Sequence, residues 1–179
     1  MGVANNNADP FTPSWEINGG YWQWGRKFEA AAGPTGSGSS QANSGSIAGW
    51  SMSEASNNAW LDNSKTVNDP CPAGYRVPTK DQWQGVLANN TFVNVGTSWS
   101  AWPTNYSSGK RVGNTLFLPA AGYRSSNSGE LDTRGAFGYY WSSTQSSVSN
   151  AWYLGFDTGS TYLVGNNRTY GQSVRCIEE

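Results

Sequence analysis

Large apolar residues alternate with small polar residues along the C-terminal part of the chain. In NAWYLGFD, residues 150–157, the side chains of Trp152, Leu154 and Phe156 share one face of a strand. The residues of the opposite face are Tyr153, Gly155 and Asp157. This two-residue period predicts that the chain from about residue 116 onward consists of strands and turns, with aromatic and small polar residues on opposite faces.

The helix signal is concentrated in PTKDQWQGVLANN, residues 78–90. Thr79 stands where a helix cap is needed, and Gln82 takes the capping-box position. One face of the predicted helix carries Trp83, Val86 and Leu87. We expect this helix to end near Asn89.

Three further segments have recognisable patterns. Two aromatic stretches around Gly-Gly in SWEINGGYWQWGRKF, residues 14–28, predict a β-hairpin. Residues 30–49 are rich in Gly and Ser and predict a long surface loop or a mobile insertion. Leu116–Leu118 predicts a buried strand that ends at Pro119.

The length and composition favour a single domain. The chain has 179 residues, with 10 Trp, 9 Tyr and 22 Gly, so we expect aromatic side chains to build the core between many turns. We predict an α+β fold with short antiparallel strands, one or two helices and many long loops. Residues 1–14 are interpreted as a flexible arm and residues 15–179 as the domain.

The charge pattern argues against several kinds of partner. The net charge is −1, and 11 basic and 12 acidic residues are spread without runs, so no footprint for nucleic acid is present. No apolar run reaches the roughly 20 residues needed to span a bilayer, so we expect no membrane insertion. The first ten residues, MGVANNNADP, lack a signal-peptide pattern.

The absence of histidine argues against an enzyme. It removes the commonest general base, the Ser-His and Cys-His pairs and most zinc sites. Glu130 and Asp132 could serve as glycosidase carboxylates, but a solvated turn explains them better. We expect no cofactor and no metal, with weak calcium binding by scattered Asp and Asn residues as the alternative.

Cys71 and Cys176 are the two cysteines of the chain. They form either one disulfide or two separate thiols. With no third cysteine to compete and no histidine for a zinc site, we favour the disulfide.

Six motifs occur in order: YWQWGRK, DPCPAGYRVPT before the helix, LFLPAAGYR, GYYWSST, NAWYLGF and GQSVRCI. This series resembles the Fibrobacter-type major paralogous domain from about Tyr21 to Ile177. The resemblance implies a C-type-lectin fold. It also implies a variable protein of a diversity-generating retroelement, in which adenine-directed errors change Asn codons near the C-terminus. Enzymes with this fold use an active-site cysteine pair, whereas Cys71 and Cys176 lie in motifs of the non-enzymatic branch.

On this resemblance, residues 138–176 form the variable region. The predicted outward, ligand-binding positions are Tyr139, Ser146, Ser147, Ser149, Tyr153, Gly155, Asp157, Thr161, Tyr162, Val164, Asn166, Thr169 and Tyr170. Gln145 is left out because adenine changes in an Asn codon do not produce Gln. The predicted fixed scaffold is Trp141, Ser142, Ser143, Trp152, Phe156, Arg168, Gly171, Arg175 and Cys176.

The predicted function is therefore non-enzymatic binding of a protein or glycan on another cell or virion. The expected location is extracellular, on a cell surface or on a virion, and the oligomeric state stays open. Tyrosines would act as anchors and small polar residues as adaptable contacts. The alternative is a module of fixed specificity, in which Trp99 or Trp102 stacks on sugar rings.

Overall fold

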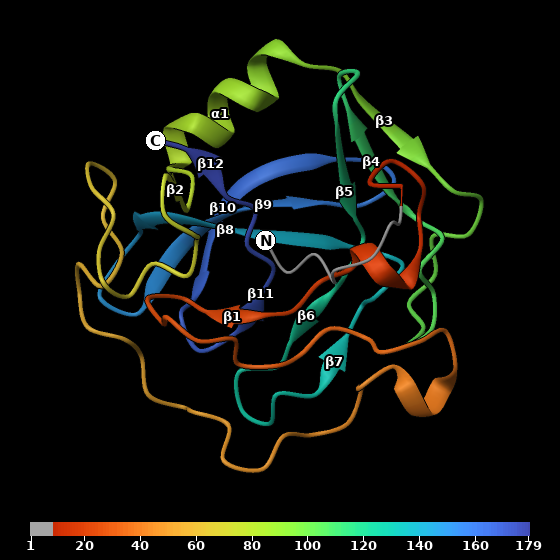
Figure 1. Ribbon diagram of the computed structural model, residues 1–179, viewed down its shortest axis with the longest axis horizontal. Helices are drawn as coiled ribbons and strands as arrows, with labels where there is room; N and C mark the ends of the chain where they lie inside the picture. Colours follow the sequence, from red (N-terminus) through yellow and green to blue (C-terminus); the bar gives the residue numbers. More distant parts are fainter. Residues whose placement is uncertain (1–8) are drawn as a thin grey trace.

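The computed structural model describes residues 9–179, and short strands joined by long loops make up most of it (Figure 1). The strands are β1 (Trp22–Gln23), β2 (Tyr75–Arg76), β3 (Phe92–Val95), β4 (Gly109–Val112), β5 (Leu116–Pro119), β6 (Tyr123–Arg124), β7 (Leu131–Asp132), β8 (Gly138–Gln145), β9 (Asn150–Phe156), β10 (Thr161–Asn167), β11 (Gly171–Gln172) and β12 (Ile177–Glu178). The helices are α1 (Lys80–Asn89) and two 3₁₀ helices, Trp15–Ile17 and Ser39–Gln41.

The α+β prediction is wrong. Within the described residues, twelve strands form four antiparallel sheets and α1 is the one α-helix, so the fold is mostly β and resembles a β-sandwich. The physical reason is that a helical period occurs along ten residues alone, whereas the rest of the chain pairs through short extended segments. Of the predicted arm, residues 1–8 lie outside the described residues.

The sheet β10–β9–β8 contains the longest strands and organises the domain. Its register aligns Tyr139, Gly155 and Tyr162 in one row across the three strands, and Trp141, Tyr153 and Val164 in the next row. Because side chains alternate along a strand, these two rows share one face of the sheet. The other face carries Tyr140, Leu154 and Phe156.

The face with Leu154 and Phe156 packs against α1 and the sheet β3–β4–β5. Leu154 and Phe156 are fully buried and contact a cluster that includes Trp83 of α1 and Leu118 of β5. The rings of Tyr140 and Phe156 stack at a centroid distance of 6.1 Å. This side of the sheet is the apolar face that the alternation predicts.

The opposite face is covered as well, which the alternation does not reveal. Trp141 and Tyr153 pack beneath the loops that carry Trp24 and Trp60. Trp24 and Trp60 lie 5.5 Å apart between ring centroids, and both are almost completely buried. The central sheet therefore lies between two apolar clusters near Trp141, whereas its other end, near Tyr139, stays closer to the surface.

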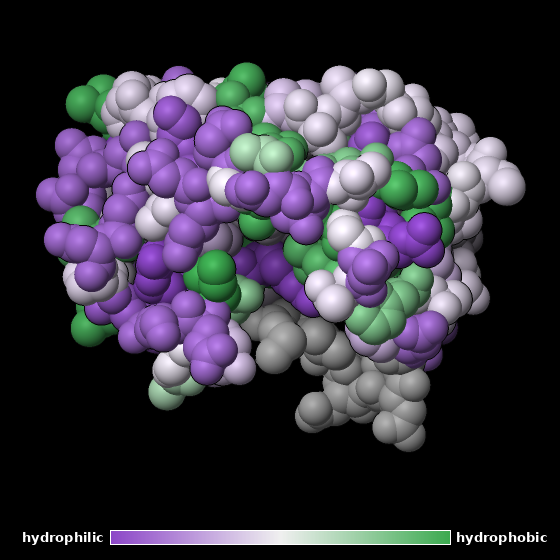
Figure 2. All heavy atoms as spheres, turned by 90° about the horizontal axis from the view of Figure 1, so that it is seen from above, coloured by the Kyte–Doolittle hydropathy of each residue, from purple (hydrophilic) through white to green (hydrophobic). Residues whose placement is uncertain are grey.

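The helix and the β5 predictions are confirmed. α1 ends at Asn89, and its cap is reciprocal: the Gln82 backbone amide donates to Thr79 Oγ1, and the Thr79 amide donates to Gln82 Oε1. β5 spans Leu116–Pro119 with Phe117 and Leu118 buried. Seen from the α1 side, hydrophilic residues gather on one half of the surface, and the other half is mostly of intermediate hydropathy with a few hydrophobic residues (Figure 2). Within the described residues, no helix has the length and apolar content that a membrane span requires.

The predicted N-terminal hairpin is absent. β1 pairs instead with β11, and Tyr21 forms a bridge with Ala31, while a 3₁₀ helix occupies Trp15–Ile17. Trp15–Ile17 is helical and so offers no extended segment to β1, whose partner β11 comes from a distant part of the chain that local spacing does not reveal.

The segment from 30 to 49 is irregular, as expected, but two buried arginines hold it in place. Arg124 donates to the carbonyls of Asn43 and Gly45, and Arg134 donates to the carbonyl of Ala42. Both arginines are 1% exposed. The sequence predicted either a surface loop or a mobile insertion for this segment, and these contacts favour the surface loop.

A disulfide joins Cys71 to Cys176, with 5.8 Å between their Cα atoms. It connects the loop before β2 to the segment before β12, and β2 and β12 pair directly. The disulfide therefore fixes the C-terminal end of the chain to the middle of the domain.

Candidate functional site

Four half-buried tyrosines form one continuous aromatic patch, here called the tyrosine surface: Tyr123, Tyr139, Tyr162 and Tyr170. Tyr123 contacts Tyr139 edge to face at 5.1 Å between ring centroids and contacts Tyr170 in the same way at 5.3 Å. Tyr153 lies beneath the patch and links Tyr139 at 5.5 Å to Tyr162 at 6.3 Å. The patch is therefore one packed unit drawn from four segments of the chain.

The topology explains why these tyrosines meet. Tyr139 is on β8, Tyr162 is on β10, Tyr123 is on β6 and Tyr170 immediately precedes β11. β11 pairs with β6 and contacts β8, and Figure 1 shows these three strands together at the centre of the molecule. The surface therefore lies where the central sheet meets the β1–β11–β6–β7 sheet.

The absence of a side chain at Gly155 leaves room for the neighbouring tyrosine rings. It stands between Tyr139 and Tyr162 in the sheet register. A Cβ atom at this position would lie 2.2 Å from Cε2 of Tyr162 and 2.8 Å from Cε2 of Tyr153. The absence of a side chain at residue 155 therefore allows the Tyr162 ring to cover the middle strand.

Burial raises the pKa of several tyrosine hydroxyl groups at the surface. Burial raises the pKa of Tyr139 to about 12 and raises the pKa of Tyr162 and Tyr153 above the ordinary tyrosine value. The pKa of Tyr123 is also raised, first by burial and then by its hydrogen bond to Asp132, in which Tyr123 Oη donates to Oδ2 over 2.8 Å. The surface therefore offers neutral phenols, not phenolates, at physiological pH.

The predicted ligand-binding residues divide into three sets. The exposed ones are Ser146, Ser147 and Val164; the half-buried ones are Tyr139, Ser149, Asp157, Thr161, Tyr162, Asn166 and Tyr170; the buried ones are Tyr153, Gly155 and Thr169. The prediction that all thirteen face outward is wrong for the buried three. Tyr153 packs against Trp141, Gly155 lies under the Tyr162 ring, and the Thr169 hydroxyl donates to Asn167 Oδ1.

The predicted residues do not form one group either. Thr161 lies on the opposite face of β10 from Tyr162 because neighbouring side chains in a strand point in opposite directions. Ser146, Ser147 and Ser149 belong to the β8–β9 turn, next to Ala151, which lies four residues and roughly 14 Å along β9 from Gly155. The serine turn and the tyrosine surface are therefore separate places.

Arg168 holds the serine turn against the domain. Its guanidinium donates to the carbonyls of Ser147 and Asn150 and to the side chain of Asn57, and it lies 4.4 Å from the centroid of the Trp24 ring. Most of the predicted scaffold is buried: Trp141, Ser142, Ser143, Phe156, Arg168 and Gly171. Half-buried members of that set are Trp152, Arg175 and Cys176.

Sequence reasoning missed Tyr123, and it considered Asp132 as a glycosidase carboxylate or a turn residue but not as part of a binding surface. No signal in the sequence marked Tyr123, because an arginine beside a tyrosine in a strand is normally the outward residue, whereas here Arg124 is the buried one. The spacing between residue 123 and residue 139 does not indicate that β6 approaches β8. Their contact depends on the intervening β11.

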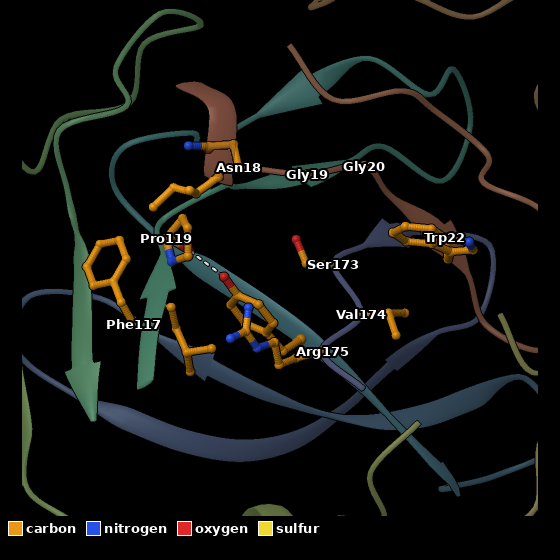
Figure 3. A pocket seen from close by; sticks show the side chains of 12 residues that line it. Asn18, Gly19, Gly20, Trp22, Phe117, Pro119, Ser173, Val174 and Arg175 are labelled. Atoms are coloured by element: carbon orange, nitrogen blue, oxygen red, sulfur yellow. Dashed lines mark hydrogen bonds between the residues drawn. The ribbon is translucent and has the colours of Figure 1, made fainter. Parts of the chain in front are cut away.

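Two hollows of the molecule lie apart from the tyrosine surface, since none of its four tyrosines lines them. Figure 3 shows a pocket between Asn18, Pro119 and Ser173, across which Tyr140 Oη donates to the Pro119 carbonyl. Its volume of about 40 Å³ suits one or two water-sized molecules and excludes an organic ligand. An open cleft of about 640 Å³ is bordered by Arg26, whose guanidinium donates to the Ser53 carbonyl. In the part of the chain that the structure describes, no three His, Cys, Asp or Glu side chains are grouped to hold a metal ion.

The two tryptophans of the sugar-stacking alternative differ in exposure. Trp99 is half-buried against Phe156, with 6.3 Å between ring centroids. Trp102 is 66% exposed. Of the two rings, Trp102 is therefore the more accessible for stacking.

Residues 102–177 match a family described as a domain of unknown function, DUF8237. The match covers less than half of the chain but includes every residue of the tyrosine surface, together with Cys176. No curated protein and no solved structure matches the chain.

Proposed function

We propose that this protein is a non-enzymatic ligand-binding protein whose tyrosine surface contacts a protein or glycan on another cell or virion, and that a retroelement diversifies its exposed C-terminal positions. The observation that carries this proposal is the joining of Tyr123, Tyr139, Tyr162 and Tyr170 into one half-exposed aromatic patch on a firmly packed sheet.

Tyrosine suits such a surface for physical reasons. Its ring supplies a large contact area at a small cost in side-chain entropy, and its hydroxyl forms hydrogen bonds with a partner. Edge-to-face contacts at 5.1 and 5.3 Å restrain Tyr123, Tyr139 and Tyr170 before a ligand arrives. A preorganised surface loses less freedom on binding, which favours affinity.

The stability of the fold comes from other parts of the molecule, and this supports diversification. Trp24, Trp60 and Trp141 are 0–1% exposed, and burial of aromatic side chains of this size supplies much of the folding free energy. Substitutions at exposed positions change stability by no more than about 0.5 kcal/mol in most cases. The positions that we propose as variable are the exposed Ser146, Ser147 and Val164, to which this figure applies, and the half-buried Tyr139, Ser149, Asp157, Tyr162, Asn166 and Tyr170.

The disulfide between Cys71 and Cys176 supports a location outside the cell. Structural disulfides persist in oxidising compartments and are rare in the reducing cytosol. We therefore propose a cell surface or virion as the place where the protein works.

The experiment that tests the proposal is sequencing of the genomic neighbourhood of the gene. We expect a near-copy of the segment for residues 138–176 beside a reverse-transcriptase gene, differing at adenines. The sharpest comparison is between Tyr162, which is half-exposed, and Tyr153, which is 7% exposed. Adenine-linked differences should occur at the Tyr162 codon and not at the Tyr153 or Gly155 codons.

Two results would contradict the proposal. Differences that occur equally at buried and exposed codons would show that the tyrosine surface is not the diversified element. The absence of any near-copy would remove diversification and leave a binding surface of fixed specificity.

A further inference from the structure

The tyrosine surface has carboxylates at its border. Asp132 is exposed and accepts the hydrogen bond from Tyr123 Oη. Asp157 follows β9 and accepts hydrogen bonds from the backbone amides of Gly159 and Ser160, which stabilise its charged form and hold its pKa below the ordinary value despite partial burial. The charges of both carboxylates act on the Tyr139 hydroxyl. Negative charge therefore lies at two places around one set of rings.

The basic residues close to Asp132 in sequence do not neutralise it. Arg124 follows Tyr123 but points to the other side, where its guanidinium lies 5.0 Å from the Tyr21 ring centroid. Arg134 follows Asp132 by two residues, yet it donates to the Pro103 carbonyl and is 1% exposed. Lys110 differs from these arginines: it is 5% exposed, and its charge helps to lower the pKa of Asp157, so it offsets part of that negative charge. Among the described residues, no ion pair involves Asp132, which therefore carries most of the negative charge that this surface presents to a partner.

Neutral tyrosine rings beside carboxylates recognise cations, and a guanidinium fits them best. The face of an aromatic ring attracts a cation, and a carboxylate accepts two parallel hydrogen bonds from the planar fork of arginine. The contact between a guanidinium and an aromatic ring occurs three times in the interior of this protein. Arg124, Arg134 and Arg168 each lie over an aromatic ring, at 4.4–5.3 Å from its centroid.

We propose that the tyrosine surface binds an arginine side chain that projects from a partner protein, with the guanidinium lying on the tyrosine rings and paired with Asp132 or Asp157. This inference rests on the proposed function and narrows it, because it selects a protein partner over a neutral glycan. It does not depend on diversification.

N-acetyl-arginine amide and N-acetyl-citrulline amide test the proposal as a matched pair. They have nearly the same shape, but citrulline carries no charge. Each is titrated into the full-length, oxidised protein at low ionic strength while two-dimensional NMR spectra record backbone and tyrosine ring signals. We expect arginine to bind in the millimolar range, to shift signals of the tyrosine surface and to weaken with added salt, whereas citrulline causes no comparable shifts.

Three substitutions locate the interaction. Asp132→Asn and Asp157→Asn keep an acceptor oxygen for the existing hydrogen bonds but remove a charge, and at least one of them should weaken arginine binding about tenfold. Asp81→Asn, in the first turn of α1, removes the same charge far along the chain and should leave binding unchanged. Near-ultraviolet circular dichroism checks that each variant is folded.

Each of three outcomes would overturn the proposal: equal binding of arginine and citrulline, shifts confined to other parts of the molecule, or no binding of either compound. A failure of this kind would leave the proposed function standing if the genome contains the near-copy of residues 138–176. Selective arginine binding without a near-copy would instead indicate a protein-binding surface of fixed specificity.

Discussion

Substitution of Gly155 by alanine tests whether the tyrosine surface is built as the structure shows. The new Cβ atom would lie 2.2 and 2.7 Å from Cε2 and Cζ of Tyr162 and 2.8 Å from Cε2 of Tyr153. Contacts below 3.0 Å require a neighbour to move, and here the neighbours are rings that pack against one another. We therefore expect Gly155→Ala to displace the Tyr162 ring and to destabilise the protein.

The magnitude follows from two opposing effects. Insertion of a methyl group into a packed site costs about 1–3 kcal/mol. Replacement of glycine by alanine in a strand stabilises the folded state by about 0.5–1 kcal/mol, because alanine loses less backbone entropy on folding. The difference is about 0–2.5 kcal/mol, and because the shortest contact is 2.2 Å we expect a net loss in the free energy of unfolding in the upper half of that range. In a Tyr162→Ala background the two shortest contacts disappear, and the loss should fall by about 1 kcal/mol or more.

The assay is urea unfolding of four proteins under non-reducing conditions: the parent chain, both single variants and the double variant. Tryptophan fluorescence reports the transition, and the four values give the coupling between residues 155 and 162. Gly85→Ala in α1 is the matched control, because a Cβ there meets no atom within 4 Å, and alanine in a helix should stabilise by up to about 1 kcal/mol. A Gly155→Ala loss that is the same with and without the Tyr162 ring would refute the contact argument.

Two further predictions concern the whole domain. Reduction of the Cys71–Cys176 disulfide, which spans 105 positions, should lower the free energy of unfolding by about 4–5 kcal/mol on the chain-entropy model, and an unchanged urea midpoint in the presence of reductant would contradict this. Because burial raises the pKa of Tyr139 to about 12 in the folded state, against about 10 when unfolded, its contribution to stability should be complete below pH 10 and disappear between about pH 10 and 12. Urea midpoints along this pH range, compared with those of Tyr139→Phe, check the prediction together with tyrosinate absorbance. A Tyr139 hydroxyl that ionises near pH 10 in the folded protein would contradict it.

Local features of the fold could be predicted because their causes are local. The capping box of α1 involves Thr79 and Gln82, three residues apart, and both of its hydrogen bonds are formed. The Leu116–Leu118 strand was recognisable from its apolar run and from the proline that follows. The prediction of an N-terminal hairpin also used local spacing, and it was wrong because β1 pairs with β11, about 150 residues away.

The candidate site could be predicted in part. The tyrosines among the predicted ligand-binding positions are Tyr139, Tyr153, Tyr162 and Tyr170. They do meet, through direct ring contacts or through Tyr123. The assumption that one face of the central sheet is open was wrong near Trp141, where the loops with Trp24 and Trp60 cover it. For this reason Tyr153 is an internal support of the surface and not a free contact.

The sequence by itself determined which side chains share a face, because a strand alternates with a period of two whatever surrounds it. It placed Leu154 and Phe156 together and Tyr139 apart from Tyr140. The tertiary structure alone decided what covers each face, because covering residues such as Trp24 come from distant parts of the chain. It also decided that Tyr123 and Asp132 join the tyrosine surface, since their position depends on β11 lying between β1 and β6.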